Sequence, residues 1–256
     1  MTMIMIGGNG PDKNGVSAYR AEPAGDGTAT RGALVVIHEI WGLADHIRCV
    51  ADRFARQGYL VLAPDLLSGV GITPEIGEEL QRARMAGEEA RTELQPALRD
   101  AMSASRSPDF AAWAVPVLTS LVDELAADPR VNGRIAVTGF CFGGSYAFAL
   151  AAADHRIRAS VPFYGSPPEL AAVGEIHCPV LAFYGDQDTR LMQTLPDVEQ
   201  AMTKAGVPFT ATVYPGVGHA FFNDSNAHAY NAGAATDAWQ RTLAFLDAHL
   251  DPAVTE

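Results

Sequence analysis

The sequence contains few cysteines and no long apolar run, and both absences narrow the classes of protein it can belong to. Its three cysteines, Cys49, Cys141 and Cys178, are odd in number and widely spaced over 256 residues. This spacing excludes a disulfide framework and a clustered Cys/His metal site, and it predicts a reduced, cytoplasmic chain without a metal. No run approaches the roughly 18 apolar residues of a membrane span. The start of the chain lacks a basic segment and a long apolar one, so no signal peptide is expected.

Basic residues are scarce as well. Lys and Arg total 18 against 30 Asp and Glu, which gives a formal net charge of −12 and a pI near 4.9. A chain this acidic is repelled by nucleic acid and by anionic membranes, so neither is expected as a partner. A small anionic substrate remains compatible with this charge, because nearby arginines can override the net field at short range.

The sequence is rich in strand-like apolar runs that alternate with amphipathic helical segments. The strand-like runs cover 16–20, 33–38, 59–63, 134–140, 157–164, 179–184 and 209–214, with 16–20 as an edge strand. Helices are expected at 45–57, with Asp45 as the cap, and at 74–84, 107–125, 195–205 and 233–249. Such alternation predicts an α/β fold with a mostly parallel central sheet and helices on both faces.

No internal repeat and no linker interrupts the chain, so residues 1–256 are predicted to form a single domain. Residues 66–109 differ from the rest, because they are charged and lack strand signals. They are predicted to form a helical insertion or lid, with a second amphipathic stretch over 88–104. The expected assembly is a monomer or a small homo-oligomer.

One short motif stands at the centre of the chain. Gly139-Phe140-Cys141-Phe142-Gly143 lies between a β-prone run and an Ala-rich helical run. Strand, sharp turn and helix is the setting in which Gly-x-Ser-x-Gly forms a nucleophile elbow, and Cys141 stands here in place of the serine. The strained turn requires small residues two positions away on each side, a need that Gly139 and Gly143 meet. The alternative is a buried structural cysteine in a glycine-rich turn.

Polar side chains follow several predicted strands at the point where each ends. Glu39 follows 33–38, Asp186 and Asp188 follow 179–184, and His219 follows 209–214. Because the carboxyl ends of parallel strands meet at one edge, these groups are expected beside Cys141. Nucleophile, acid, histidine is the chain order of α/β-hydrolase triads, in which the acid orients the imidazole. Spacing leaves both aspartates open as that acid, since Asp186 can equally cap its loop.

The other histidines and cysteines are predicted to lie in the core or on the surface without a catalytic role. His38 ends a buried strand and is predicted to be a hydrogen-bonded core residue, and no role is assigned to His177. Cys49 and Cys178 are predicted to be buried. Solvated surface positions are predicted for His46, His155, His228 and His249.

Together these motifs resemble the dienelactone hydrolase (carboxymethylenebutenolidase) family of α/β-hydrolases. The resemblance covers roughly residues 33–250, and the motifs run in family order. They are His38-Glu39-Ile40-Trp41-Gly42, Ala63-Pro64-Asp65-Leu66, Gly139-Phe140-Cys141-Phe142-Gly143-Gly144, Phe163-Tyr164-Gly165, Gly185-Asp186-Gln187-Asp188 and Gly218-His219-Ala220-Phe221. The resemblance implies an α/β-hydrolase fold. It also implies hydrolysis of a small lactone or ester through a cysteine nucleophile and an acyl-enzyme, without a cofactor.

The resemblance also implies roles for individual residues. Cys141, Asp188 and His219 would form the triad, and Glu39 would take the thiol proton when substrate binds. The alternative for Glu39 is a carboxylate that caps the following helix. The implied oxyanion hole consists of the backbone N–H groups of Ile40 and Phe142. The expected substrate-binding side chains are Trp41, Tyr164, Phe221 and Asn223.

The sequence departs from the family pattern at one point. Family members that act on dienelactone hold its carboxylate with arginines, one of them a few residues after the catalytic histidine. Here that loop reads His219-Ala220-Phe221-Phe222-Asn223-Asp224 and has no arginine. An amide such as that of Asn223 cannot reproduce a bidentate guanidinium clamp. The predicted replacement is a cation from the 66–109 insertion, namely Arg82, Arg84 or Arg91.

Two other functions remain open. The same Cys-His-Asp site could serve a general carboxylesterase or thioesterase. A non-catalytic binding protein of the same fold is the third reading. The full set Glu39, Cys141, Asp188 and His219 argues against that reading, because a degenerate site usually lacks a member.

Overall fold

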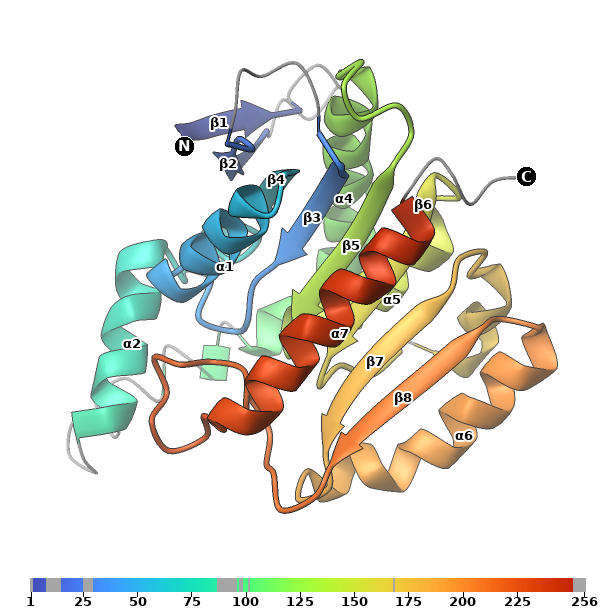
Figure 1. Cartoon of the computed structure of the whole chain (residues 1–256). Coiled ribbons are helices and arrows are strands. Elements are labelled where there is room, and N and C mark those ends of the chain that lie inside the picture. Colours follow the sequence, from blue (N-terminus) through green and yellow to red (C-terminus); the bar gives the residue numbers. More distant parts are fainter. Residues whose placement is uncertain are drawn as a thin grey trace.

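An eight-stranded sheet with the order β1-β2-β4-β3-β5-β6-β7-β8 runs through the chain (Figure 1). The computed structural model describes residues 2–7, 15–24, 30–86, 96, 99–100, 102–167 and 169–250. The strands are β1 (Thr2–Ile6), β2 (Val16–Ala21), β3 (Gly32–Ile37), β4 (Tyr59–Pro64), β5 (Ile135–Phe140), β6 (Ile157–Phe163), β7 (Val180–Gly185) and β8 (Phe209–Tyr214).

The sheet is mostly parallel, as predicted. Strands β3 to β8 pair in parallel with their neighbours, and only the β1–β2 and β2–β4 pairs are antiparallel. The chain leaves β3 toward β4 and returns to the other side of β3 for β5, so the winding direction reverses between β3 and β5. In open α/β sheets, ligands bind beyond the carboxyl ends of the strands at such a reversal. Glu39 lies two residues past the end of β3, and Cys141 directly follows β5.

Helices cover both faces of the sheet. In Figure 1, α1 and α7 lie in front of the sheet and α4 and α5 lie behind it. This arrangement confirms the predicted α/β-hydrolase architecture. The helices are α1 (Asp45–Arg56), α2 (Pro74–Ala86), α4 (Pro108–Ala127), α5 (Phe142–Ala153), α6 (Thr189–Ala205) and α7 (Ala232–Leu250), with short 3₁₀ turns η1 (Ser68–Val70) and η2 (Leu170–Glu175).

Two local predictions were wrong. The strand at 16–20 is not the edge strand, because β1 pairs along its outer side. The run in β1 is apolar at four of its five positions, so it lacks the polar/apolar alternation by which a half-exposed strand is recognised. Asp45 does not cap α1 either. Ala44 occupies the N-cap without a side-chain hydrogen bond, and Asp45 is the first helical residue.

The segment 66–109 contains the predicted helix at 74–84, and the helix predicted from 107 begins at its end. It begins with η1 and α2, and α4 starts at Pro108 behind an N-cap at Ser107. The second amphipathic stretch, 88–104, lies largely outside the described residues, apart from helical backbone over 102–105 and at a few earlier positions. The proposed lid movement of this segment therefore stays a prediction.

One helix among the described residues, α4, has the length and apolar composition to cross a membrane. This was not anticipated, because polar and charged positions interrupt its apolar residues. Its buried side chains, from Phe110 to Leu125, belong to the main hydrophobic core. The helix packs against α5 and the central strands β3, β4 and β5. That packing is typical of a core helix.

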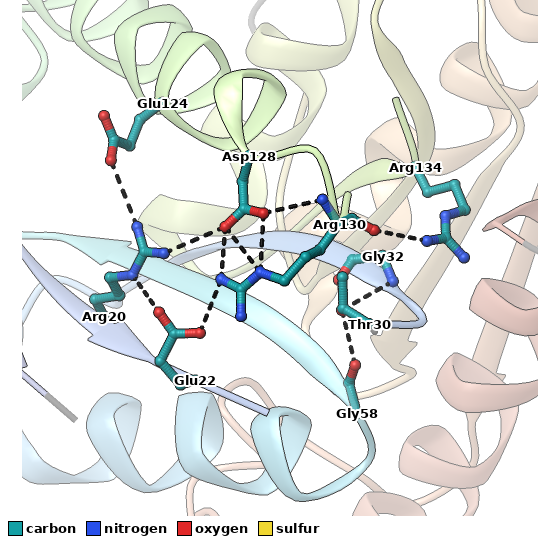
Figure 2. Close-up of polar contacts among 9 residues, drawn as sticks. All are labelled: Arg20, Glu22, Thr30, Gly32, Gly58, Glu124, Asp128, Arg130 and Arg134. Atoms are coloured by element: carbon teal, nitrogen blue, oxygen red, sulfur yellow. Dashed lines mark hydrogen bonds and ion pairs between the residues drawn. The ribbon is translucent and has the colours of Figure 1, made fainter. Parts of the chain in front are cut away.

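A polar network joins the sheet to α4 at the edge opposite the carboxyl ends of the parallel strands (Figure 2). Arg20 at the end of β2 pairs with Glu22, and it also pairs with Glu124 and Asp128 of the α4 terminus. Arg130 bridges Asp128 and Glu22, with nitrogen–oxygen distances of 2.5 and 3.1 Å. Both carboxylates therefore have two guanidinium partners, and the pKa of each lies below its usual value despite the opposing effect of burial.

Candidate active site

Cys141 lies on a sharp turn between β5 and α5. Its backbone has φ 55° and ψ −110°, a conformation that L-residues rarely adopt. Its N–H donates to the Phe163 carbonyl at 3.0 Å, which ties the turn to β6. A Cβ on Gly139 would overlap the Gly143 carbonyl, and a Cβ on Gly143 would overlap the Ile37 carbonyl. The motif is therefore the predicted strand–turn–helix, and both glycines are sterically required.

His219 and Asp188 form a hydrogen-bonded pair. Nδ1 of His219 lies 2.5 Å from Oδ2 of Asp188, while Oδ1 of Asp188 accepts from the Leu191 N–H at the start of α6. Because an ionised carboxylate can only accept, the proton of this bond belongs to Nδ1 of the imidazole. Nε2 of His219 is thereby left free to face Cys141, and the interaction with Cys141 contributes to the raised pKa of His219.

The electrostatics of this group favour a charged histidine. Burial alone would lower the pKa of His219, but hydrogen bonds to Asp188 and Cys141 outweigh it and raise the pKa to about 10. For Asp188, burial raises the pKa, and the hydrogen bond and charge of His219 overcome this effect and lower it. The resting pair is therefore imidazolium and carboxylate at neutral pH.

The two aspartates after β7 have different contacts. Oδ1 of Asp186 accepts the Gly216 N–H at 2.8 Å and so caps the neighbouring loop. Asp188 alone of the two contacts His219. The geometry therefore favours Asp188 over Asp186 as the carboxylate that orients His219.

His38 holds the loop after β3 against the start of α5. Its Nδ1 lies 2.6 Å from the Glu39 carbonyl, and its Nε2 accepts the Leu66 N–H at 3.1 Å. Both nitrogens are used and burial lowers the pKa of His38, so the ring is neutral with its proton on Nδ1. The carbonyl of His38 accepts the Gly143 N–H at 3.0 Å. The prediction of a hydrogen-bonded core histidine is confirmed, and these bonds place the loop that carries Ile40 beside Phe142.

Glu39 is buried, with 2% of its surface exposed. Its Oε1 accepts the Tyr164 hydroxyl at 3.2 Å, and its Oε2 accepts the Asn223 amide at 2.5 Å. Both oxygens are held by neutral groups on elements other than α1, so Glu39 does not cap that helix. Burial, together with the charges of Glu39 and Cys141, raises the pKa of Tyr164 well above its usual value, so the hydroxyl remains a donor.

A cavity of about 650 Å³ opens over Cys141. The thiol, His219, Asp188, both residues of the predicted oxyanion hole and two arginines all line this cavity. Its lining is Ile40, Met102, Ser105, Arg106, Cys141, Phe142, Ser145, Tyr146, Tyr164, Ser166, Asp188, Arg190 and His219. The N–H of Phe142 is the first of α5 and has no partner within the helix, as at every helix N-terminus.

The predicted substrate-binding side chains divide into two groups. Tyr164 lines the cavity, whereas Trp41, Phe221 and Asn223 do not. Phe221 is fully buried among the rings of Tyr164 and Tyr214. Asn223, with 1% exposed, is bonded to Glu39. Contact of these three side chains with a substrate therefore stays a prediction, and in this structure only Tyr164 of the four faces the cavity.

Two arginines that the sequence analysis did not single out line the cavity among the described residues. Arg82 is exposed on α2 and donates to the Glu78 carbonyl, while the Arg84 side chain and Arg91 lie outside the described residues. Arg106 and Arg190 line the cavity instead. Within the described part of the chain neither guanidinium has an ion-pair partner. Arg190 stands two residues after Asp188, in the first turn of α6, a position from which its approach to the rim could have been anticipated.

Six further predictions, for histidines and cysteines outside the candidate site, can be compared with the structure. His46 is buried rather than solvated, and its Nδ1 lies 3.0 Å from Oδ1 of Asp224 in the loop after His219. Cys49 is exposed, contrary to prediction, because it lies on the outer side of α1. Cys178 is buried, as predicted. Of the remaining histidines, His155 and His228 are exposed and His249 is half-buried.

No group of three or more His, Cys, Asp or Glu side chains within the described ranges has a geometry that could hold a metal ion. The candidate site is therefore described by its organic side chains and backbone groups alone.

The sheet order, the strained turn at Cys141 and the topological position of the site define an α/β-hydrolase. A model of the dienelactone hydrolase family matches residues 16–250. The chain belongs to this family of ester-cleaving hydrolases.

Individual relatives agree with this assignment. A provisionally named carboxymethylenebutenolidase from Saccharolobus solfataricus is 33% identical over 229 residues, which cover 84% of this chain and 88% of that protein. One from Synechocystis sp. is 31% identical over 250 residues, 92% of each chain. The crystal structure of a provisionally named dienelactone hydrolase from Klebsiella pneumoniae matches with a TM-score of 0.78 at 26% identity, over 96% of this chain and 97% of that one.

Proposed function

We propose that this protein hydrolyses a small lactone or carboxylic ester through Cys141 and an acyl-enzyme intermediate. The observation that carries the proposal is the placement of the Cys141 thiol on a strained turn, beside a histidine that is already bonded to an aspartate, in one cavity. Covalent acyl transfer requires a nucleophile, an imidazole that protonates the leaving group and then activates water, and a third group that orients the imidazole.

The reaction begins as the thiol gives its proton to Glu39 and the sulfur attacks the carbonyl carbon. The ester or ring C–O bond then breaks, and the leaving oxygen takes a proton from the His219 imidazolium. In the second half, neutral His219 removes a proton from water as its oxygen attacks the thioester. The sulfur leaves and recovers its proton from Glu39. One water is consumed, and every protein group returns to its starting state.

The tetrahedral oxyanion is stabilised by the N–H groups of Ile40 and Phe142. Both residues line the cavity beside Cys141, one on the loop after β3 and one at the start of α5. Donors aimed at the developing charge typically contribute a factor of about 10² to 10³ in kcat each. The hydrogen bonds of His38 to the surrounding backbone hold these two segments together before substrate arrives.

Arg106 and Arg190 supply the substrate preference in this proposal. The loop after His219 has no arginine, yet the cavity contains two guanidinium groups from other elements. Arginine recognises carboxylates by paired hydrogen bonds, so these side chains suit an ester or lactone that carries a separate carboxylate. Phe142 and Tyr146 give the rest of the cavity an aromatic wall for an unsaturated or cyclic body.

A general carboxylesterase or thioesterase on the same site is the second candidate, and the open cavity is the observation that favours it. The proposed setting is cytoplasmic, on the basis of the free cysteines. The proposed form is a monomer or small homo-oligomer.

Steady-state hydrolysis of a dienelactone and of a neutral aryl ester, with Cys141→Ala as the control, tests the proposal. We expect both activities to fall at least about 10³-fold in Cys141→Ala, and dienelactone to be the better substrate of the wild type. Ester turnover alone, lost in the variant, would favour the general esterase. Unchanged turnover in Cys141→Ala would refute the nucleophile, and no turnover of either substrate would favour the binding-protein reading.

A further inference from the structure

We infer that Asn223 is a positioning residue that holds the Glu39 carboxylate in place as the proton acceptor for Cys141. The inference rests on the proposed function, because it assigns Asn223 a role through Glu39 and not through substrate. Asn223 lies in the loop between β8 and α7, 184 positions from Glu39 along the chain. Its side chain is almost fully buried and is not among the residues that line the cavity, so in this structure its contact is with Glu39.

The contact between the two side chains is short and buried. The amide nitrogen of Asn223 donates to Oε2 of Glu39 at 2.5 Å, and the two residues are 1% and 2% exposed. The Tyr164 hydroxyl donates to the other oxygen at 3.2 Å. A carboxylate with one fixed donor on each oxygen cannot rotate without breaking a hydrogen bond in a place that water does not reach.

The orientation of the Asn223 amide is fixed by its own surroundings. Its Oδ1 accepts the Ser225 backbone N–H at 3.1 Å and the Ser225 hydroxyl at 2.6 Å. Gln81 of α2 donates to the same oxygen at 3.4 Å. A backbone N–H can only donate, so the oxygen of the amide must face Ser225 and its nitrogen must face Glu39. The amide therefore presents N–H, and never a lone pair, to the carboxylate.

The neutrality of the Asn223 amide is as important as the geometry of its bond to Glu39. Among the described residues no Lys or Arg forms an ion pair with Glu39. Its titratable hydrogen-bond partner is Tyr164, whose ring lies beside that of His219 and whose pKa is raised by the charges of Glu39 and Cys141. A guanidinium at position 223 would hold Glu39 as an anion through a full positive charge. An amide supplies direction without charge, so Glu39 is held in place and remains able to accept the thiol proton.

The loop that carries Asn223 is itself anchored. Asp224 bonds to buried His46 of α1 at 3.0 Å, and Arg53 of α1 lies over the ring of Phe222. Gln81 bonds to Ser225 as well as to Asn223. Contacts from α1 and α2 thus fix the loop on both sides of Asn223, which is what a positioning residue needs.

Two substitutions test the inference with different chemistry. Asn223→Asp keeps the shape and places a second carboxyl group against Glu39, where the two must share a proton. Asn223→Ser shortens the side chain, so that its hydroxyl lies too far from Glu39 to replace the amide donor, and it adds no charge. Asp224→Asn is the matched control, since it removes a charge from the same loop, its amide can still bond to His46, and the Glu39 contact stays intact. Each is made with and without Glu39→Gln, and thermal unfolding verifies folding.

The readouts are the pH profile of kcat/KM for the aryl ester and, without substrate, the pH profile of Cys141 alkylation by iodoacetamide. Exposed Cys49 is replaced by Ser for the alkylation. We expect the acid limb of both profiles to move up by about one pH unit or more in Asn223→Asp, and by less in Asn223→Ser. Asp224→Asn should not move it. In the Glu39→Gln background, Asn223→Asp should change kcat/KM and the alkylation rate by less than about twofold. Residue 223 acts through the Glu39 carboxylate, which this background lacks.

Specific outcomes overturn the inference. A loss in Asn223→Asp by the same factor at every pH would indicate a structural role, as would an equal loss in the Glu39→Gln background. If Glu39→Gln alters both profiles while neither Asn223 variant does, the inference fails and the proposed function stands. If Glu39→Gln and Cys141→Ala both leave ester turnover unchanged, the proposed function fails and the inference with it.

Discussion

Backbone strain marks the site at the scale of single residues. Cys141, Tyr164 and Ala220 have φ values of 55°, 38° and 63°, and all three lie on loops that meet at the site. Each such residue costs about 1–3 kcal/mol, which a fold retains only when its surroundings determine the conformation. At Cys141 the surroundings are the glycines of the turn and the hydrogen bond to Phe163. The strain aims the thiol out of the sheet and into the cavity.

Gly143→Ala tests how tightly this turn is packed. The added methyl group would overlap the carbonyl oxygens of Ile37 and His38, which are backbone atoms of the central strand and its loop. We expect a loss of about 3 kcal/mol in the free energy of unfolding, measured by urea denaturation, because the backbone itself must move. Gly174→Ala is the control, since nothing lies within 4 Å of the new methyl. Equal stabilities of the two variants would contradict the steric account.

The raised pKa of His219 predicts how stability depends on pH. Its value of about 10 in the folded chain exceeds the ordinary 6.5, so the stabilisation is complete below about pH 6.5 and is lost as the pH rises toward 10. We expect the stability advantage of the wild type over His219→Asn to be greatest near pH 6 and to shrink steadily up to about pH 10. Thermal unfolding at a series of pH values measures it. An advantage that grows with pH would contradict the sign.

At the scale of elements, α4 connects the core to the cavity. It starts directly after Arg106, and its N-cap is Ser107, whose hydroxyl accepts the Phe110 N–H at 3.1 Å. Pro108 at the first helical position needs no hydrogen-bond acceptor for its nitrogen. The far end of the helix is held by the network of Figure 2. Both ends of α4 are therefore fixed by polar groups that can be removed singly.

Ser107→Ala removes the cap at the cavity end. We expect the unfolding free energy to fall by about 1 kcal/mol, because the Phe110 N–H loses its acceptor. Ser120→Ala, in the middle of the same helix, removes a hydroxyl that only bonds back to the Pro116 carbonyl and should change stability by less than about 0.5 kcal/mol. Urea denaturation of both variants decides the matter. A larger effect at Ser120 would show that Ser107 does not act as the cap.

Asp128→Asn removes the centre of the network at the other end. Asp128 accepts from the Arg130 guanidinium and backbone and also faces Arg20, and its pKa is lowered by these contacts. A lowered pKa gives stability that is present above about pH 4 and lost as the pH falls through the folded-state value. We expect Asp128→Asn to cost about 1–2 kcal/mol at pH 7 and to approach the wild type at about pH 3. A cost independent of pH would mean that charge is not responsible.

At the scale of the whole molecule, sequence periodicity predicts most of the fold. The runs at 33–38 and 134–140 are almost continuously apolar, a pattern that predicts strands covered on both faces. Strands β3 and β5 are buried at every position, as that pattern predicts. Gly139 and Gly143 predict the turn because its steric requirement is local. The edge strand of the sheet was predicted wrongly. Because β1 is short and mostly apolar, its sequence shows no alternation between a buried and an exposed face.

The candidate site is predicted only in part, for a physical reason. Groups that directly follow strands are brought together by the sheet, as Asp188 and His219 are. Arg106 comes from an insertion, and its approach to Cys141 depends on the path of a helix that no pattern in the sequence records. Asn223 contacts Glu39 from 184 positions away, and which side of its loop it occupies depends on Ser225 and Gln81. Such contacts become visible only in three dimensions.

The charge of the whole molecule opposes that of its cavity, and this opposition can be measured. A net charge of −12 repels an anionic substrate at long range, whereas Arg106 and Arg190 attract it within a Debye length of about 10 Å. The double variant Arg106→Gln/Arg190→Gln keeps only the repulsion. Its kcat/KM for an anionic ester should rise as NaCl goes from about 20 to about 300 mM, since salt screens repulsion. The wild type should rise less or fall, because salt screens its attraction as well. A neutral ester, which feels neither field, is the control, and identical salt responses of the two proteins would show that these arginines do not face the substrate charge.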